Sequence, residues 1–137
     1  MQVRNGMTDA VLTVGPGHTL REAARAMSSR KVGAALVNDL DQPGPGIITE
    51  RDILTSIAAG QDPDSETVAD HLSANLTFAA PEWSLERAAE AMVKGGFRHL
   101  VVVDDGEIVG VLSIRDIVRC WTQDGATSDM PREEARA

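Results

Sequence analysis

The chain has 137 residues, a formal net charge of -8 at pH 7 and a hydrophobic content of 42%. This length fits one domain or two small units that share a core. Because non-specific contacts with nucleic acid and with acidic membranes need clustered Lys and Arg, the acidic balance argues against both. A small phosphorylated ligand, which senses only its local field, is not excluded.

Cysteine content and hydropathy exclude further classes. A single cysteine, Cys120, cannot form an internal disulfide and cannot by itself hold a structural zinc ion. No apolar run is long enough to cross a bilayer, and the N-terminus does not read as a signal peptide. We therefore expect a cytoplasmic protein.

The first half of the chain predicts the order strand, helix, strand, strand, helix after an irregular N-terminal segment. Thr19 is a helix-capping residue, and the apolar residues that follow it recur at the spacing of one helix face. Pro45 cannot donate to a sheet ladder, so the strand after it should be short or lie at an edge. In chain order we expect a strand at 11–14, a helix from 19 to about 29, strands at 34–37 and 47–48, and a helix from about 50 to 58.

The second half predicts the same order with clearer signals. A short helix is expected at 67–72, and Asp105-Gly106 between two apolar runs is a strong hairpin signal. Beyond Asp124 the composition is small, charged and proline-bearing, which is typical of a disordered tail. We expect a strand at 76–79, a helix from 84 to about 94, strands at 100–103 and 108–112, and a helix from about 114 to 122.

The two halves are copies of each other. A shift of 65 residues aligns their helical apolar stripes, and the shift becomes 64 after the turn that precedes Gly46. Two half-size units of this kind bury their faces on each other, which implies an approximate twofold axis and two related clefts. We assign a first repeat at 7–60, a linker at 61–66, a second repeat at 67–123 and a tail at 124–137.

One stretch recurs in both copies and carries the candidate chemistry. Gly46–Asp52 and Gly110–Asp116 each read as a glycine, a short buried strand, a hydroxyl residue at a helix start, and an Arg-Asp pair. Amide groups at a helix N-terminus favour anions, and a carboxylate can accept hydrogen bonds from sugar hydroxyls. This combination can meet a phosphorylated sugar.

Simple helix capping is the alternative explanation of the stretch. Thr49-x-x-Asp52 and Ser113-x-x-Asp116 are capping boxes, in which the hydroxyl and the acid satisfy free amides at a helix start. Thr19-x-x-Glu22 has the same spacing without any claim to be a ligand site. Capping explains the hydroxyl and the acid, but it does not require the Arg.

The element order, the duplication and the repeated Gly-apolar-apolar-Ser/Thr-x-Arg-Asp ending resemble a tandem CBS domain pair, also called a Bateman module. The resemblance covers about 7–122 and implies an α/β (α+β) fold of two β-α-β-β-α repeats related by a pseudo-twofold axis. The stretch at 57–63 is also similar to that of stand-alone actinobacterial proteins of the hypoxic response protein type.

In such modules adenosine ligands such as AMP, ADP, ATP or S-adenosylmethionine lie in clefts between the repeats. The resemblance implies that the motif aspartates bind ribose and that the motif hydroxyls and nearby cations face phosphate. Arg98–Asp104 is similar to a stretch of the gamma subunit of AMP-activated kinase, where a basic pair that enters the strand reaches phosphate. The candidate ligand-binding residues are Asp116, Ser113, Arg115, Arg98, His99, Asp52, Thr49 and Arg51.

The two copies depart from each other at the basic pair. Arg98 and His99 correspond to Gly33 and Ala34, which are not cationic. The two clefts are therefore not expected to bind one ligand equally, and the favoured site uses Ser113, Asp116, Arg98 and His99.

Three classes of function compete. The favoured one is a regulatory module that senses an adenine nucleotide, with no required cofactor and no metal. The alternative is a ligand-free module for dimerisation or protein interaction, in which the motif only caps helices. An enzyme is the least favoured, because no nucleophile-base pair, metal-ligand cluster or glycine-rich phosphate loop stands out. The resemblance also implies a homodimer, with an unknown downstream protein partner.

Overall fold

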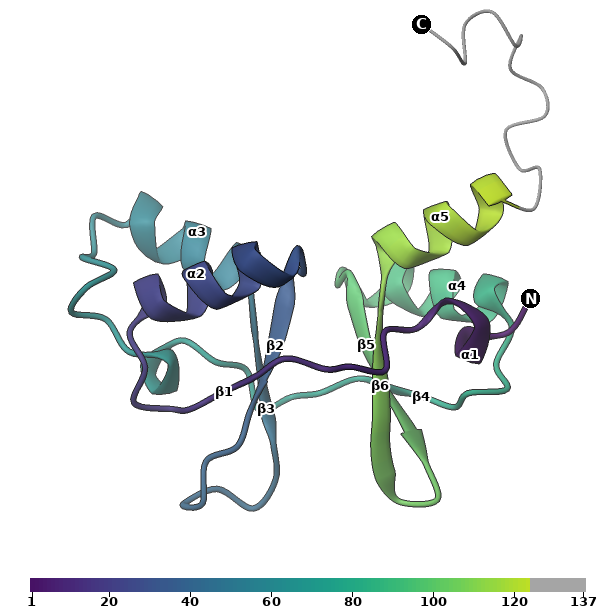
Figure 1. The fold of residues 1–137 in the computed structure, drawn as a ribbon, viewed down its shortest axis with the longest axis horizontal. Helices are drawn as coiled ribbons and strands as arrows, with labels where there is room; N and C mark the ends of the chain where they lie inside the picture. Colours follow the sequence, from purple (N-terminus) through teal and green to yellow (C-terminus); the bar gives the residue numbers. More distant parts are fainter. Residues whose placement is uncertain (124–137) are drawn as a thin grey trace, which may run out of the picture. The chain divides into compact units, whose positions relative to one another are not determined.

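The computed structural model describes residues 1–123, which form two compact units. The first unit is Ala10–Thr77, and the second unit combines Met1–Asp9 with the chain from Phe78 onward. Figure 1 labels their helices and strands. The repeat boundaries at 7–60 and 67–123 rest on sequence similarity and stay a prediction, and the expected disordered tail lies outside the described residues.

The first unit is a three-stranded sheet with helices. The strand order is β1-β2-β3, with β1 parallel and β3 antiparallel to the central strand. The antiparallel register places Ala34 opposite Thr49. Its elements are β1 (Thr13–Val14), α2 (Leu20–Arg30), β2 (Ala34–Val37), β3 (Gly46–Thr49), α3 (Glu50–Ala58) and the short 3-10 helix η1 (Val68–Asp70).

The second unit repeats this plan. Its sheet has the order β4-β5-β6, again with one parallel and one antiparallel pairing, and the register places His99 opposite Ser113. The mixed α+β class and the duplicated β-α-β-β-α order predicted from the sequence are thus confirmed. Its elements are α1 (Val3–Gly6), β4 (Phe78–Ala79), α4 (Leu85–Gly95), β5 (His99–Asp104), β6 (Glu107–Ser113) and α5 (Ile114–Gln123).

Each unit has its own core, built from the apolar stripe of its first long helix and the central strand of its sheet. The helical spacing of Leu20, Ala23 and Met27 places all three on the buried face of α2. The corresponding stripe of α4 is buried in the other unit. The sequence-predicted stripes are therefore core positions.

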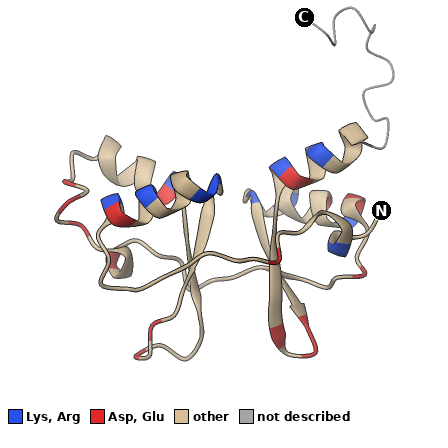
Figure 2. Cartoon of the chain, viewed as in Figure 1, with Lys and Arg blue, Asp and Glu red and all other residues tan. Residues whose placement is uncertain are grey.

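Turn chemistry explains where β5 and β6 meet. Asp105 and Gly106 both have positive φ angles, 53° and 81°, as a two-residue type I′ hairpin requires. The hairpin predicted from Asp105-Gly106 is confirmed. Acidic residues, drawn red in Figure 2, flank this turn.

The N-terminal segment was expected to be irregular, and this expectation is wrong. It forms α1 and packs within the second unit, where the Val3 amide donates to the Trp83 carbonyl at 2.8 Å. Thr8 exchanges two backbone hydrogen bonds with Val111 on β6. A helix of four residues is too short to show an apolar period, and its partners lie far along the chain, so local pattern could not predict it.

The segment at 68–73, which follows the predicted linker, makes the corresponding contacts in the first unit. Val68 of η1 is as fully buried as Val3 of α1, 65 positions earlier, and Ser73 pairs with Ile47 on β3. The segment that opens each repeat thus packs within the unit formed by the other repeat. No helix within residues 1–123 is long and apolar enough to cross a membrane.

Candidate ligand-binding site

Both motif copies lie where an antiparallel strand runs directly into a helix. Each begins with a glycine at a point of close backbone approach. A Cβ on Gly46 would lie 3.1 Å from the Ser73 carbonyl oxygen, and one on Gly110 would lie 2.9 Å from the Thr8 carbonyl oxygen. The motif glycines therefore admit the extended segments that pair with β3 and β6.

The first copy is a complete capping box at the start of α3. The Thr49 hydroxyl accepts a hydrogen bond from the Asp52 amide at 3.3 Å. One carboxylate oxygen of Asp52, Oδ2, accepts from the Thr49 amide at 2.8 Å and from the Thr49 hydroxyl at 3.0 Å. The other oxygen, Oδ1, has no hydrogen-bond partner among residues 1–123.

The second copy is a capping box with an added ion pair. The Ser113 hydroxyl accepts from the Asp116 amide at 3.1 Å, and Asp116 Oδ2 accepts from the Ser113 amide at 2.8 Å. Asp116 Oδ1 pairs with the Arg119 guanidinium at 3.1 Å. Arg119 also donates to the carbonyl of Gly6 at 3.2 Å, which ties α5 to α1. Asp116 is 7% exposed.

The motif arginines take no part in capping. Arg51 and Arg115 are exposed, and neither makes a hydrogen bond or ion pair with any residue in the described range. Capping therefore accounts for the hydroxyl and the acid of each copy and leaves the cation beside the helix start without a structural partner.

The second unit gathers the favoured candidates at one strand end. His99 and Ser113 are opposite each other in the β5–β6 register, so their side chains share a face of the sheet. The Arg98 carbonyl accepts from the Ile114 amide at 2.9 Å, and the Arg98 side chain is exposed. Ser113, Asp116, Arg98 and His99 are thus neighbours at the start of α5.

Two residues at the candidate site were not predicted from the sequence. Arg119 holds Asp116, and its place in the first copy is taken by Thr55. Glu50 lies beside Gly33, at the position that Ile114 occupies in the second copy. An aligned comparison of the two copies, within the motif for Glu50 and one turn beyond it for Arg119, would have revealed both differences.

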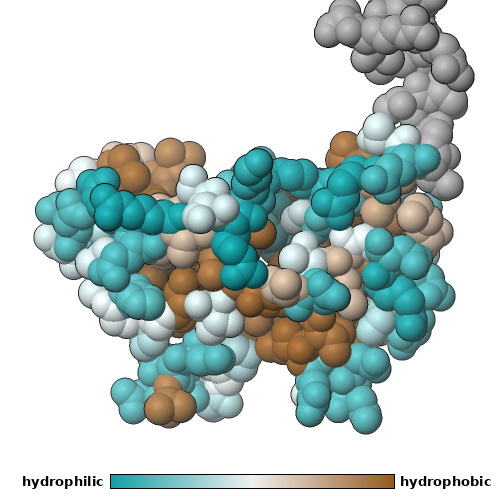
Figure 3. Space-filling model, viewed as in Figure 1, coloured by the Kyte–Doolittle hydropathy of each residue, from teal (hydrophilic) through white to brown (hydrophobic). Residues whose placement is uncertain are grey.

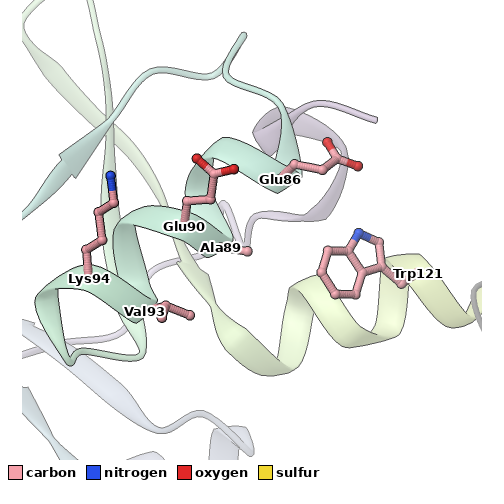
Figure 4. Close-up of a pocket in the computed structure, with 6 residues that line it drawn as sticks. All are labelled: Glu86, Ala89, Glu90, Val93, Lys94 and Trp121. Carbon is pink, nitrogen blue, oxygen red and sulfur yellow. The ribbon is translucent and has the colours of Figure 1, made fainter.

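A separate apolar pocket of about 380 Å³ lies between α4 and α5. Trp121 from α5 faces Ala89 and Val93 of α4, with Glu86, Glu90 and Lys94 around them (Figure 4). None of the predicted ligand-binding residues lines it. Within residues 1–123, no group of three or more His, Cys, Asp or Glu side chains is arranged to hold a metal ion.

The CBS domain family model matches residues 2–59 and 68–122, and the chain therefore belongs to the CBS domain family as a tandem pair. The similarity to the hypoxic response protein type stays a prediction. The first match begins at residue 2, in agreement with the structural equivalence of α1 and η1.

Known relatives share the family and differ in size. The CBS domain-containing protein CBSCBSPB3 of Arabidopsis thaliana is 37% identical over 110 residues, which are 80% of this chain and 19% of that protein. The chain thus spans about a fifth of the length of its first curated relatives. The CBS domain-containing protein YhcV of Bacillus subtilis is 35% identical over 116 residues, 84% of this chain and 81% of that protein.

A solved structure of similar fold carries a ligand. A CBS domain protein from Pyrobaculum aerophilum complexed with AMP is 31% identical, with a TM-score of 0.74, and the match covers 93% of this chain and 99% of that one.

Proposed function

We propose that this chain is a regulatory module that binds an adenine nucleotide at its repeated motif. The observation that carries the proposal is the exposed, unpartnered arginine beside each capping box. A helix cap needs a hydroxyl and an acid, whereas an anionic ligand needs a cation near free amides. The AMP complex of the Pyrobaculum aerophilum relative supports an adenosine ligand.

The second copy is the better proposed phosphate site. Arg98 and Arg115 supply exposed cations, with His99 beside Ser113. Charge-assisted hydrogen bonds from such groups to phosphate oxygens are stronger than neutral ones. Asp116 would hold ribose in the second copy, and Asp52 would hold ribose in the first, where Thr49 and Arg51 occupy the positions of Ser113 and Arg115. AMP, ADP, ATP or another adenosyl compound fits this description.

Calorimetric titration of the purified chain with AMP, ADP, ATP and S-adenosylmethionine tests the proposal. We expect a micromolar Kd for at least one nucleotide, which corresponds to a binding free energy of about -8 kcal/mol. Arg115→Gln should weaken it about tenfold or more, because a hydrogen bond to a charged group contributes roughly 1.5–3 kcal/mol. Arg25→Gln is the matched control, since Arg25 is exposed on α2 and makes no hydrogen bond or ion pair within residues 1–123.

The competing function predicts a different result. Both capping boxes are complete without a ligand, which favours a purely structural motif in an interaction module. No heat with any of the four compounds would support that reading. Equal weakening by Arg115→Gln and Arg25→Gln would likewise contradict the proposed site.

A second copy of the chain is the proposed oligomeric partner. The last helix of each repeat exposes two apolar residues one turn apart, Leu54 and Ile57 on α3, and Val118 and Trp121 on α5. Apolar atoms are visible over α3 in Figure 3. The downstream protein that reads the ligand state is a separate partner.

A further inference from the structure

The two motif copies differ in charge at a pair of positions that a backbone hydrogen bond joins. In the first unit the Glu50 amide donates to the Gly33 carbonyl at 2.9 Å, and in the second unit the Ile114 amide donates to the Arg98 carbonyl at 2.9 Å. The shared backbone bond establishes that the positions are equivalent. A glycine and an acid in one copy thus stand where an arginine and an apolar residue stand in the other.

The Glu50 carboxylate fills the space that Gly33 leaves open. A Cβ on Gly33 would lie 3.1 Å from a Glu50 carboxylate oxygen. Glu50 is exposed, and its side chain makes no hydrogen bond or ion pair with another residue in the range 1–123. A negative charge therefore stands at the start of α3, beside the strand end that leads into the helix.

The other charges near the two motif copies also leave the second copy more positive than the first. In the first copy the motif holds one cation, Arg51, and two acids, Glu50 and the half-buried Asp52, and Lys31 lies two residues before Gly33. In the second copy Arg119 already offsets Asp116 at 3.1 Å. Two further exposed cations, Arg98 and Arg115, are left beside the helix start of that copy. A phosphate is attracted to the second copy and repelled by the nearby Glu50 in the first.

We infer that Glu50 is a specificity-determining residue, through which the first copy takes an adenosine-type ligand without a phosphate group and the second copy takes the phosphorylated form. This inference rests on the proposed function above. A neutral ribose is indifferent to the Glu50 charge, and Asp52 Oδ1 is open to accept a hydrogen bond from a ribose hydroxyl. The first copy thus keeps the sugar-binding acid and Arg51, but it has no counterpart of Arg98, and Glu50 opposes a phosphate there.

Site-resolved titration with adenosine and AMP tests the inference. Backbone amide NMR signals of residues 49–52 and 113–116 report on the two copies separately. In the natural sequence, AMP should bind the first copy at least tenfold more weakly than adenosine does. At the second copy, AMP should bind at least as tightly as adenosine does. Glu50→Gln should strengthen AMP at the first copy about tenfold and leave adenosine within twofold, because a like-charge repulsion has been removed.

Two further variants make the test specific. Glu50→Ile reproduces the residue of the second copy and should act like Glu50→Gln. Glu107→Gln removes the same charge from the exposed first residue of β6 in the other unit and should leave the first copy unchanged.

Equal AMP and adenosine affinities at the first copy would overturn the inference, as would an AMP affinity there that does not change in Glu50→Gln. In both cases the ligands bind and the proposed function stands. If neither ligand binds at either of the two copies, the proposed function fails, and the inference fails with it. If AMP binds the second copy and adenosine does not bind the first, only the inference fails.

Discussion

The two motif aspartates both follow an arginine at the start of a helix, but they make different contacts. Asp116 is buried and uses both carboxylate oxygens, one for the Ser113 amide and one for Arg119. Asp52 is half-buried and uses one oxygen only. Substitution of Asp116 therefore tests folding as well as ligand binding, which is why the exposed Arg115 is the better probe of the site.

We predict that Asp116→Ala lowers the free energy of unfolding more than Asp52→Ala does. Loss of a helix cap costs about 1 kcal/mol in either case. Asp116→Ala also removes the partner that orients Arg119 against the Gly6 carbonyl, which brings its expected cost to about 2 kcal/mol. Urea unfolding followed by circular dichroism measures both. Equal losses in the two variants would mean that the Arg119 pair adds nothing to stability.

At the scale of elements, the motif glycine serves the fold rather than the ligand. Gly110 lets the N-terminal segment lie against β6, where Thr8 and Val111 exchange backbone hydrogen bonds. Gly46 does the same for Ser73 in the first unit. The first residue of each motif is thus explained by sheet pairing, and the ligand hypothesis rests on the residues at its other end.

Gly110→Ala should destabilise the chain by roughly 1–3 kcal/mol, the usual cost of overpacking. The added Cβ would meet the Thr8 carbonyl at 2.9 Å and force α1 away from β6. Hydrogen exchange at the Thr8 and Val111 amides should accelerate as the pairing loosens. Gly44→Ala is the matched control, because a Cβ there meets no atom within 4 Å and should leave stability unchanged. Slow exchange at both amides in Gly110→Ala would refute this explanation.

Local pattern predicted the regular elements well and the long-range contacts poorly. The strand at 34–37 and the helix at 50–58 match β2 and α3 residue for residue, because turn residues and an apolar period mark their ends. The α1 helix escaped notice because its contacts with Trp83 and Val111 are tertiary. The approach of Glu50 to Gly33 was equally hidden, since it depends on how a strand end meets a helix start. The eight candidate site residues stay predictions as ligand contacts.

At the scale of the whole molecule, duplication repeats surface features as well as core ones. Leu54 and Ile57 correspond to Val118 and Trp121 at the shift of 64 residues, and all four are exposed. Capping and core packing do not require apolar side chains at these positions. A partner that also carries two such apolar pairs could cover both pairs of this chain. A second copy of the chain is a partner of that kind.

We therefore predict that Trp121→Glu and Ile57→Glu each weaken self-association at least tenfold. A carboxylate placed in an apolar interface loses its hydration without gaining a partner, and this penalty opposes association. Light scattering over a range of protein concentrations measures the dimer fraction. Leu40→Glu is the matched control: Leu40 is fully exposed in the β2–β3 loop, and its counterpart in the second repeat is Asp105. A natural chain that is monomeric at high micromolar concentration, or a Leu40→Glu variant that dissociates equally, would contradict the predicted interface.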